Sequence, residues 1–163
     1  MNTKKTAILG LVLAYALILS YIESLIPYFG GVPGMKLGLP NMAIVYLLYD
    51  YGEREGIFVN VLRIVLSGLL FGNLFGILFS VSGAVISFVA MCLVKRTNVF
   101  DIRGVSICGG IAHNIGQILI AAFVVKTTGV VYYLPLLLIS GSVCGYLNGF
   151  IAESFIGYIN RSR

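Results

Sequence analysis

The chain has 163 residues, of which 59% are hydrophobic and only 10% are charged, and its mean hydropathy is +1.00. An average soluble domain has about 45–50% apolar and about 25% charged residues, so this composition excludes a soluble protein and indicates one that needs lipid. The net charge of +5 comes from basic residues in short segments between apolar runs, whereas a nucleic-acid-binding protein needs a clustered basic surface.

The uncharged stretches predict an all-α membrane protein with six transmembrane helices in one domain, residues 1–163. A helix needs about 20 mostly apolar residues to cross the bilayer, and charges, Gly and Pro mark its ends. The second stretch, 37–49, is too short, so we expect it to be partly extended, thinly covered or half-buried by neighbours. The run 64–94 is too long for one crossing, and we expect Gly72-Asn73 to break it. The expected helices are 6–26, 40–51, 56–71, 74–94, 104–125 and 130–151.

The distribution of Lys and Arg predicts that both termini are cytoplasmic, because cytoplasmic loops carry the excess of these residues. With the amino terminus inside, eight Lys and Arg residues lie in inner segments, and only Lys36 and Lys126 lie in outer ones. The first apolar run follows two lysines and contains Ala14-Tyr15-Ala16, which resembles a signal-peptide cleavage site. The run continues well beyond that site, so we expect a retained helix.

Arg63 is the one basic residue inside an expected helix, where an ionisable side chain costs roughly 2.5–3.5 kcal/mol. It shares a helical face with Asn60 and Ser67, which predicts an inward-facing substrate-binding residue. The alternative is that the side chain extends to the cytoplasmic interface, because Arg63 lies only a few residues from the start of its helix.

The segment GGIAHNIGQ holds the densest group of polar residues in an apolar run. His113 and Gln117 are four residues apart and share a helical face, with Asn114 next to them. We expect these three residues either to bind substrate or to form hydrogen bonds between helices.

A further set of polar residues is predicted to form an extracellular opening to the binding site. Glu23 lies near the outer end of the first helix, and Lys36 lies in the Gly- and Pro-rich segment that follows. Asn41 begins the second helix and Asn73 lies in the next outer loop. The alternative is a connecting loop with a solvated Lys36 and a Glu23 that touches water.

The cysteines Cys92, Cys108 and Cys144 are widely spaced in apolar runs, without the spacing of a metal site. We therefore expect packing residues, no metal and no cofactor. Gly10 and Ala14 form a small-xxx-small pair on the first helix, which permits close packing either within the chain or against a second subunit.

The segments ILSYIESLIP, PGMKLGLPN, LRIVLSGLLFGN and AHNIGQ, in this order, resemble the bacterial family labelled heptaprenyl diphosphate synthase component I, also called the Gx transporter family. That family resembles the six-helix substrate-binding S components of energy-coupling factor transporters. The resemblance implies a multi-pass protein of the bacterial cytoplasmic membrane that binds a vitamin-like molecule. It also implies docking, through Gly10 and Ala14, onto a membrane subunit driven by ATPases, although the usual docking motif has alanine at both positions.

The residue types argue against catalysis by this chain. A prenyl diphosphate synthase needs paired carboxylates to hold Mg²⁺, and this chain has no two adjacent acidic residues. It also has no GxxxxGK[ST] sequence, so ATP hydrolysis would have to come from partners. The expected function is therefore substrate binding for uptake of a small vitamin-like, anionic or amphipathic molecule. The alternatives are an accessory subunit of heptaprenyl diphosphate or quinone synthesis and a component of a flavin- or quinone-linked redox complex.

Overall fold

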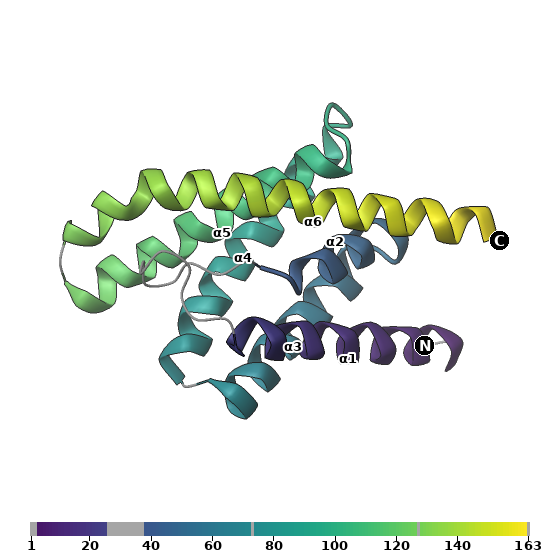
Figure 1. Ribbon diagram of the computed structural model, residues 1–163, viewed down its shortest axis with the longest axis horizontal. Helices are drawn as coiled ribbons and strands as arrows, with labels where there is room; N and C mark the ends of the chain where they lie inside the picture. The colour runs from purple at the N-terminus through teal and green to yellow at the C-terminus, as the bar shows by residue number, and fades with distance from the viewer. Residues whose placement is uncertain (1–2, 26–37, 73, 127, 163) are drawn as a thin grey trace.

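The computed structural model describes residues 3–25, 38–72, 74–126 and 128–162, and these residues contain helices and no β-strand. Figure 1 shows the helices packed side by side, with both ends of the chain at the same end of the molecule. In chain order the elements are α1 (Thr3–Leu25), α2 (Asn41–Asp50), α3 (Glu53–Phe71), α4 (Leu74–Arg96), α5 (Ile102–Val125), the 3₁₀ helix η2 (Thr128–Tyr133) and α6 (Leu134–Ser162).

Among the described residues, four helices are long and apolar enough to cross a membrane, and they indicate a multi-pass membrane protein. These segments are Thr3–Leu25, Gly76–Arg96, Ile102–Val124 and Leu134–Arg161. The expected number of crossings was six. The helix α3 has 19 residues, but three charged residues in its first turn and Arg63 lower its hydropathy. The helix α2 has 10 residues and is only about 15 Å long, which is half the thickness of the hydrocarbon layer.

The short helix α2 lies at the centre of the hydrophobic core. Its seven consecutive residues from Met42 to Leu48 are all buried, and Leu47 and Leu48 are fully inaccessible. The helices α1, α3 and α6 pack against α2, and α4 contributes Phe88 and Met91 to the same core. A helix that is apolar on every side is stable only when it is covered on every side. Of the three alternatives for this segment, the structure therefore shows a short helix buried by its neighbours.

The last helix, α6, continues beyond residue 151, the expected end of the sixth membrane span. The helix continues to Ser162 because no proline interrupts residues 152–162 and because Glu153 forms an ion pair with Arg103 of α5. Its 29 residues span about 43 Å, which exceeds the roughly 30 Å of hydrocarbon. The carboxyl-terminal part of α6 therefore extends beyond the apolar layer.

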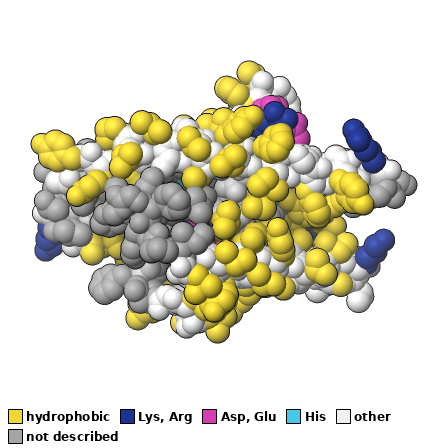
Figure 2. Space-filling view, in the orientation of Figure 1, with side chains coloured by type: hydrophobic (Ala, Val, Ile, Leu, Met, Phe, Trp, Pro, Cys, Tyr) yellow, Lys and Arg dark blue, Asp and Glu magenta, His cyan; other side chains and the backbone are white. Residues whose placement is uncertain are grey.

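In the part of the chain that the structure describes, ion pairs join neighbouring helices toward the end of the molecule that holds the chain termini. Lys5 of α1 pairs with Glu55 of α3, and Arg103 of α5 pairs with Glu153 of α6. Arg96 of α4 donates two hydrogen bonds to Glu53 of α3, at 3.1 and 2.7 Å. In Figure 2 the visible Lys and Arg side chains lie at the margins of a mostly hydrophobic face. The ion pairs thus link the ends of neighbouring helices whose middle sections contact lipid.

These ion pairs predict a loss of stability in acid. Hydrogen bonds from Arg96 and Lys5 lower the pKa of Glu53 and Glu55, respectively, below the ordinary value. A carboxylate with a lowered pKa in the folded state stabilises the fold above its unfolded pKa, and that contribution is lost as the pH falls through the folded pKa. Thermal unfolding of the detergent-solubilised protein should therefore show a lower Tm as the pH falls below about 4.3.

The matched variant for this prediction is Glu53→Gln/Glu55→Gln, which removes both titrating groups. Its Tm at neutral pH should be slightly lower than that of the unmodified chain, and the difference between the two should shrink in acid. An equal acid dependence in the two proteins would show that other carboxylates cause the effect.

Candidate functional site

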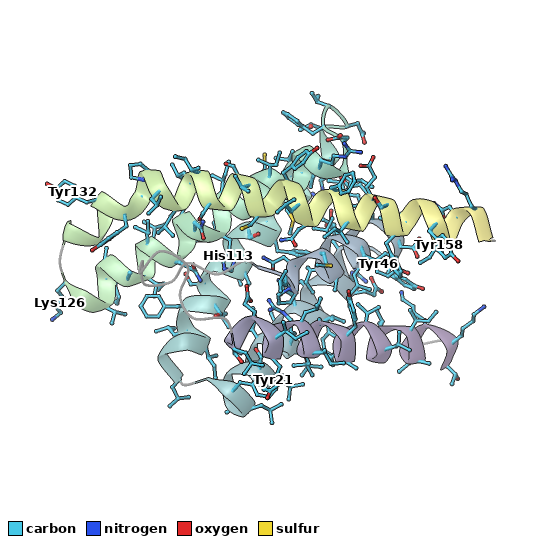
Figure 3. The ribbon with its side chains drawn as sticks, viewed as in Figure 1. Tyr21, Tyr46, His113, Lys126, Tyr132 and Tyr158 are labelled. Carbon is cyan, nitrogen blue, oxygen red and sulfur yellow. The ribbon has the colours of Figure 1, made fainter. Side chains whose placement is uncertain are left out.

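A polar cavity lies where α5, α6 and the start of α2 meet. Its volume is about 30 Å³, enough for one or two water molecules and far below the roughly 300–1,000 Å³ of a pocket for a drug-sized ligand. In Figure 3, His113 lies in the interior of the molecule, between an end marked by Lys126 and Tyr132 and an end marked by Tyr158. The lining residues are Gly38, Asn41, Gly110, His113, Asn114, Gln117, Gly141, Cys144, Gly145 and Asn148.

Glycines bring α5 and α6 into backbone contact beside the cavity. A Cβ on Gly110 of α5 would lie 2.1 Å from the carbonyl oxygen of Gly141 in α6. Gly145 and Gly149 follow at intervals of four residues, and a Cβ on either would lie 2.7 Å from the backbone of α5. Repeated small residues at this spacing allow such close approach of membrane helices. The glycines of the segment GSVCGYLNG therefore set the distance between α5 and α6, which form two walls of the site. This segment was not among the sequence predictions.

The amide side chains in the cavity are buried, and they differ in how many partners they have. The Nδ2 of Asn114 donates to the carbonyl oxygen of Leu137, which links α5 to α6. The Nδ2 of Asn148 donates to the carbonyl oxygen of Gly38 at 2.9 Å. Gln117 is only 7% exposed, and its amide forms no hydrogen bond to another described residue. The cavity thus contains a buried amide whose donors and acceptor are available.

Gly38 joins three helices at one wall of the cavity. Its backbone has φ +68°, a left-handed conformation that glycine adopts without strain. Its N–H donates to a carboxylate oxygen of Glu23 in α1, while its carbonyl oxygen accepts from Asn148 of α6 and from the backbone N–H of Asn41 in α2. A Cβ at this position would lie 3.0 Å from Nδ2 of Asn41. Glu23 therefore contributes to the site by fixing Gly38.

Arg63 lies in a second polar site, between α1 and α3. Its side chain is 7% exposed, so it is buried in the bundle and does not extend to the interface. Its Nη2 donates to Oδ1 of Asn60 at 2.8 Å and its Nη1 donates to Oγ of Ser20 at 3.3 Å, while its Nε has no partner among the described residues. The negative charge of Glu23 acts on Arg63. Glu23 is thus the residue that the two polar sites share.

The structure brings together four of the predicted substrate-binding residues and separates the others. Asn41, His113, Asn114 and Gln117 line the cavity. Glu23 borders it through Gly38, whereas Arg63 does not line it. Lys36 and Asn73 lie outside the described residues.

Three residues of the cavity were not predicted from the sequence: Gly38, Cys144 and Asn148. Asn148 had a usable signal, because it is an amide inside a long apolar run, as Asn114 is. Gly38 had none, because its role depends on contacts with two helices distant in sequence. Among the described residues, no group of three or more His, Cys, Asp and Glu side chains is placed to hold a metal ion.

The predicted partner-interface residues Gly10 and Ala14 are exposed on α1. A Cβ on Gly10 would meet no atom within 4 Å, so this glycine takes no part in packing among the described residues. Leu11, Ile18 and Leu25 on the same helix are each more than half exposed. The outward surface of α1 is therefore apolar and open to lipid or to a partner helix.

One comparison with known proteins gives a match. The sequence model of the family described as heptaprenyl diphosphate synthase component I matches residues 12–155, which is most of the chain. No curated protein and no solved structure matches.

Proposed function

Because this chain belongs to the heptaprenyl diphosphate synthase component I family, we propose that it is the membrane-embedded binding subunit of a multi-subunit assembly. The family description names a component, and a component implies a partner. In the proposed assembly this chain binds a small molecule at the polar cavity and moves it across the bacterial cytoplasmic membrane. ATPase subunits supply the energy through a membrane coupling subunit.

The observation that carries this proposal is the polar cavity inside an otherwise apolar bundle. Buried amides in a membrane protein are costly unless they are hydrogen-bonded. The amide of Gln117 borders the cavity and has no such bond to another described residue, so a group inside the cavity must satisfy it. Interhelical hydrogen bonding explains Asn114 but leaves Gln117 unexplained. Polar side chains that converge on a space from several elements are the usual arrangement of a ligand site. The small size of the cavity indicates that it holds one polar group of the substrate.

The proposal places catalysis and ATP hydrolysis on partners. The sequence has neither paired acidic residues for Mg²⁺ and diphosphate nor a phosphate-binding loop for ATP. The exposed small residues of α1 offer a surface on which the coupling subunit can dock.

A second candidate function is favoured by the family description. In that case the chain is an accessory membrane subunit of heptaprenyl diphosphate synthesis and holds a soluble prenyltransferase at the membrane, where its long apolar product accumulates. The mostly hydrophobic outer face of the helices suits this role as well as transport (Figure 2).

Native mass spectrometry of the protein, purified gently from its own membranes, distinguishes the two functions. Under the transport proposal we expect a vitamin-sized molecule and co-purifying ATPase and coupling subunits. A prenyltransferase chain or a bound prenyl lipid in their place would overturn it and support the accessory role.

Docking through α1 makes a separate prediction. The Gly10→Leu substitution adds a bulky side chain where nothing lies within 4 Å, so the fold should be unaffected while close helix packing against a partner is blocked. Co-purification of the partner should fall at least about tenfold, which corresponds to roughly 1.4 kcal/mol. The matched control is Gly157→Leu, which changes another open glycine near the other end of the chain. Equal recovery of the partner with both variants would exclude Gly10 from the interface.

A further inference from the structure

We infer that the cavity recognises an uncharged group with both a hydrogen-bond donor and an acceptor, such as a carboxamide, lactam or ring imide. This inference rests on the proposed function and names the substrate class for it. It differs from the expectation of an anionic substrate, in which Lys36, Arg63 and His113 would meet the negative charge.

The chemistry of the cavity lining favours an uncharged ligand group. The described lining residues are glycines, three asparagines, one glutamine, one histidine and one cysteine, without Lys, Arg, Asp or Glu. A side-chain amide presents an acceptor oxygen and two donor hydrogens. The best complement to several such groups is a ligand edge that also carries both a donor and an acceptor.

The charged side chains nearest to the cavity, Glu23 and Arg63, do not favour an anionic ligand. Glu23 accepts the N–H of Gly38, so a negative charge lies just behind one wall of the cavity. The guanidinium of Arg63 is directed to Asn60 and Ser20, between α1 and α3, and Arg63 does not line the cavity. A carboxylate or phosphate in this cavity would lose its hydration and lie near Glu23, without a Lys or Arg among the described lining residues. The electrostatics therefore disfavour an anion and tolerate a neutral group.

Two side-chain amides that line the cavity form no hydrogen bond to another described residue. Gln117 is 93% buried, points into the cavity, and has no hydrogen-bond partner among the described residues. The side-chain amide of Asn41, which lines the cavity from α2, likewise forms no hydrogen bond to another described residue, although its backbone N–H donates to Gly38. Two unpartnered amides on different helices can hold the two sides of one donor and acceptor edge. An apolar ligand group would leave both amides unsatisfied, which costs about 1–3 kcal/mol for each.

The test compares pairs of probes that have the same shape and differ in charge: acetamide against acetate, and benzamide against benzoate. Binding to the full chain in detergent is measured by thermal shift and by saturation-transfer NMR, at a pH of about 7.5 where both acids are ionised. We expect saturable binding of at least one amide in the millimolar range and at least roughly tenfold weaker binding of its acid. Equal or tighter binding of the acid would overturn the inference, and so would the lack of saturable binding of either amide up to about 100 mM.

A variant locates the bound probe. Gln117→Met keeps the length of the side chain and removes its donors and acceptor, so it should weaken amide binding at least roughly tenfold. The control is Asn160→Leu, which removes an exposed amide from the projecting end of α6. Unchanged amide binding in Gln117→Met would overturn the assignment to this cavity. If this variant fails to fold, the comparison of amide and acid on the unmodified chain still decides the inference.

The inferred substrate class and the proposed transport function can fail independently of each other. If native mass spectrometry finds ATPase subunits together with an anionic ligand, the transport proposal stands and the inferred substrate class is wrong. If it finds a prenyltransferase while the amide probes bind, the cavity chemistry stands and the transport proposal is wrong.

Discussion

The substitution Gly110→Ala should strongly destabilise the bundle. The new Cβ would lie 2.1 Å from the carbonyl oxygen of Gly141, and it would meet rigid backbone. The close contact can be relieved only if α5 and α6 move apart, and overpacking of this kind costs about 1–3 kcal/mol and occasionally more. We therefore expect a clear fall in Tm, measured by far-ultraviolet circular dichroism of the protein in detergent.

The matched control is Gly157→Ala on α6. A Cβ at Gly157 meets no atom within 4 Å, and alanine favours a helix over glycine by about 0.8–1.0 kcal/mol. Gly157→Ala should therefore leave Tm unchanged or raise it. If Gly110→Ala unfolds at the same temperature as this control, the backbone contact between α5 and α6 does not determine the stability of the bundle.

A loss of packing at Gly110 should also affect the cavity, because Gly110 and Gly141 form part of its lining. Helices that move apart change the distance between Asn114 on α5 and Leu137 on α6, which share a hydrogen bond. The variant should thus bind acetamide more weakly even at temperatures where it remains folded.

The positions of most helices could be predicted from the sequence because charge and hydropathy are local properties. The break at Gly72-Asn73 was predicted from the length of an uncharged run, and α3 ends at Phe71 while α4 begins at Leu74. The burial of α2 could not be predicted, because it depends on which helices surround a segment of only 10 residues. The continuation of α6 beyond residue 151 could not be predicted from hydropathy, because the apolar run ends before the helix does. Glu153, which ends the run, is paired with Arg103.

The candidate site was only partly predictable for the same physical reason. Polar residues stand out in an apolar run, so His113, Asn114 and Gln117 were found from one segment of the sequence. Which polar residues meet depends on the contacts between helices, and α5 packs mainly against α6 and α4. This arrangement adds Asn148 to the cavity and leaves Arg63 outside it.

Glu23 and Arg63 carry opposite charges at the junction of the two polar sites. Replacing Glu23 with Gln removes the negative charge that acts on the buried guanidinium and weakens the hydrogen bond to the N–H of Gly38. A buried charge that loses its counter-charge is strongly destabilising, so Glu23→Gln should lower the free energy of unfolding by about 1–3 kcal/mol. Chemical denaturation in mixed detergent micelles measures this change.

Arg63→Met should cost less than Glu23→Gln, because it removes the buried charge itself and keeps most of the apolar volume. In the Arg63→Met background, Glu23→Gln should then lose the part of its effect that comes from the charge of Arg63 and keep the part that comes from its other contacts, including that with Gly38. A coupling energy of about 1 kcal/mol or more in this double-mutant cycle would demonstrate the interaction. Additive effects would mean that the stabilising contribution of Glu23 does not depend on Arg63. In that case Arg63 would be stabilised by Asn60 and Ser20 alone, and the α1–α3 site would be energetically independent of the cavity.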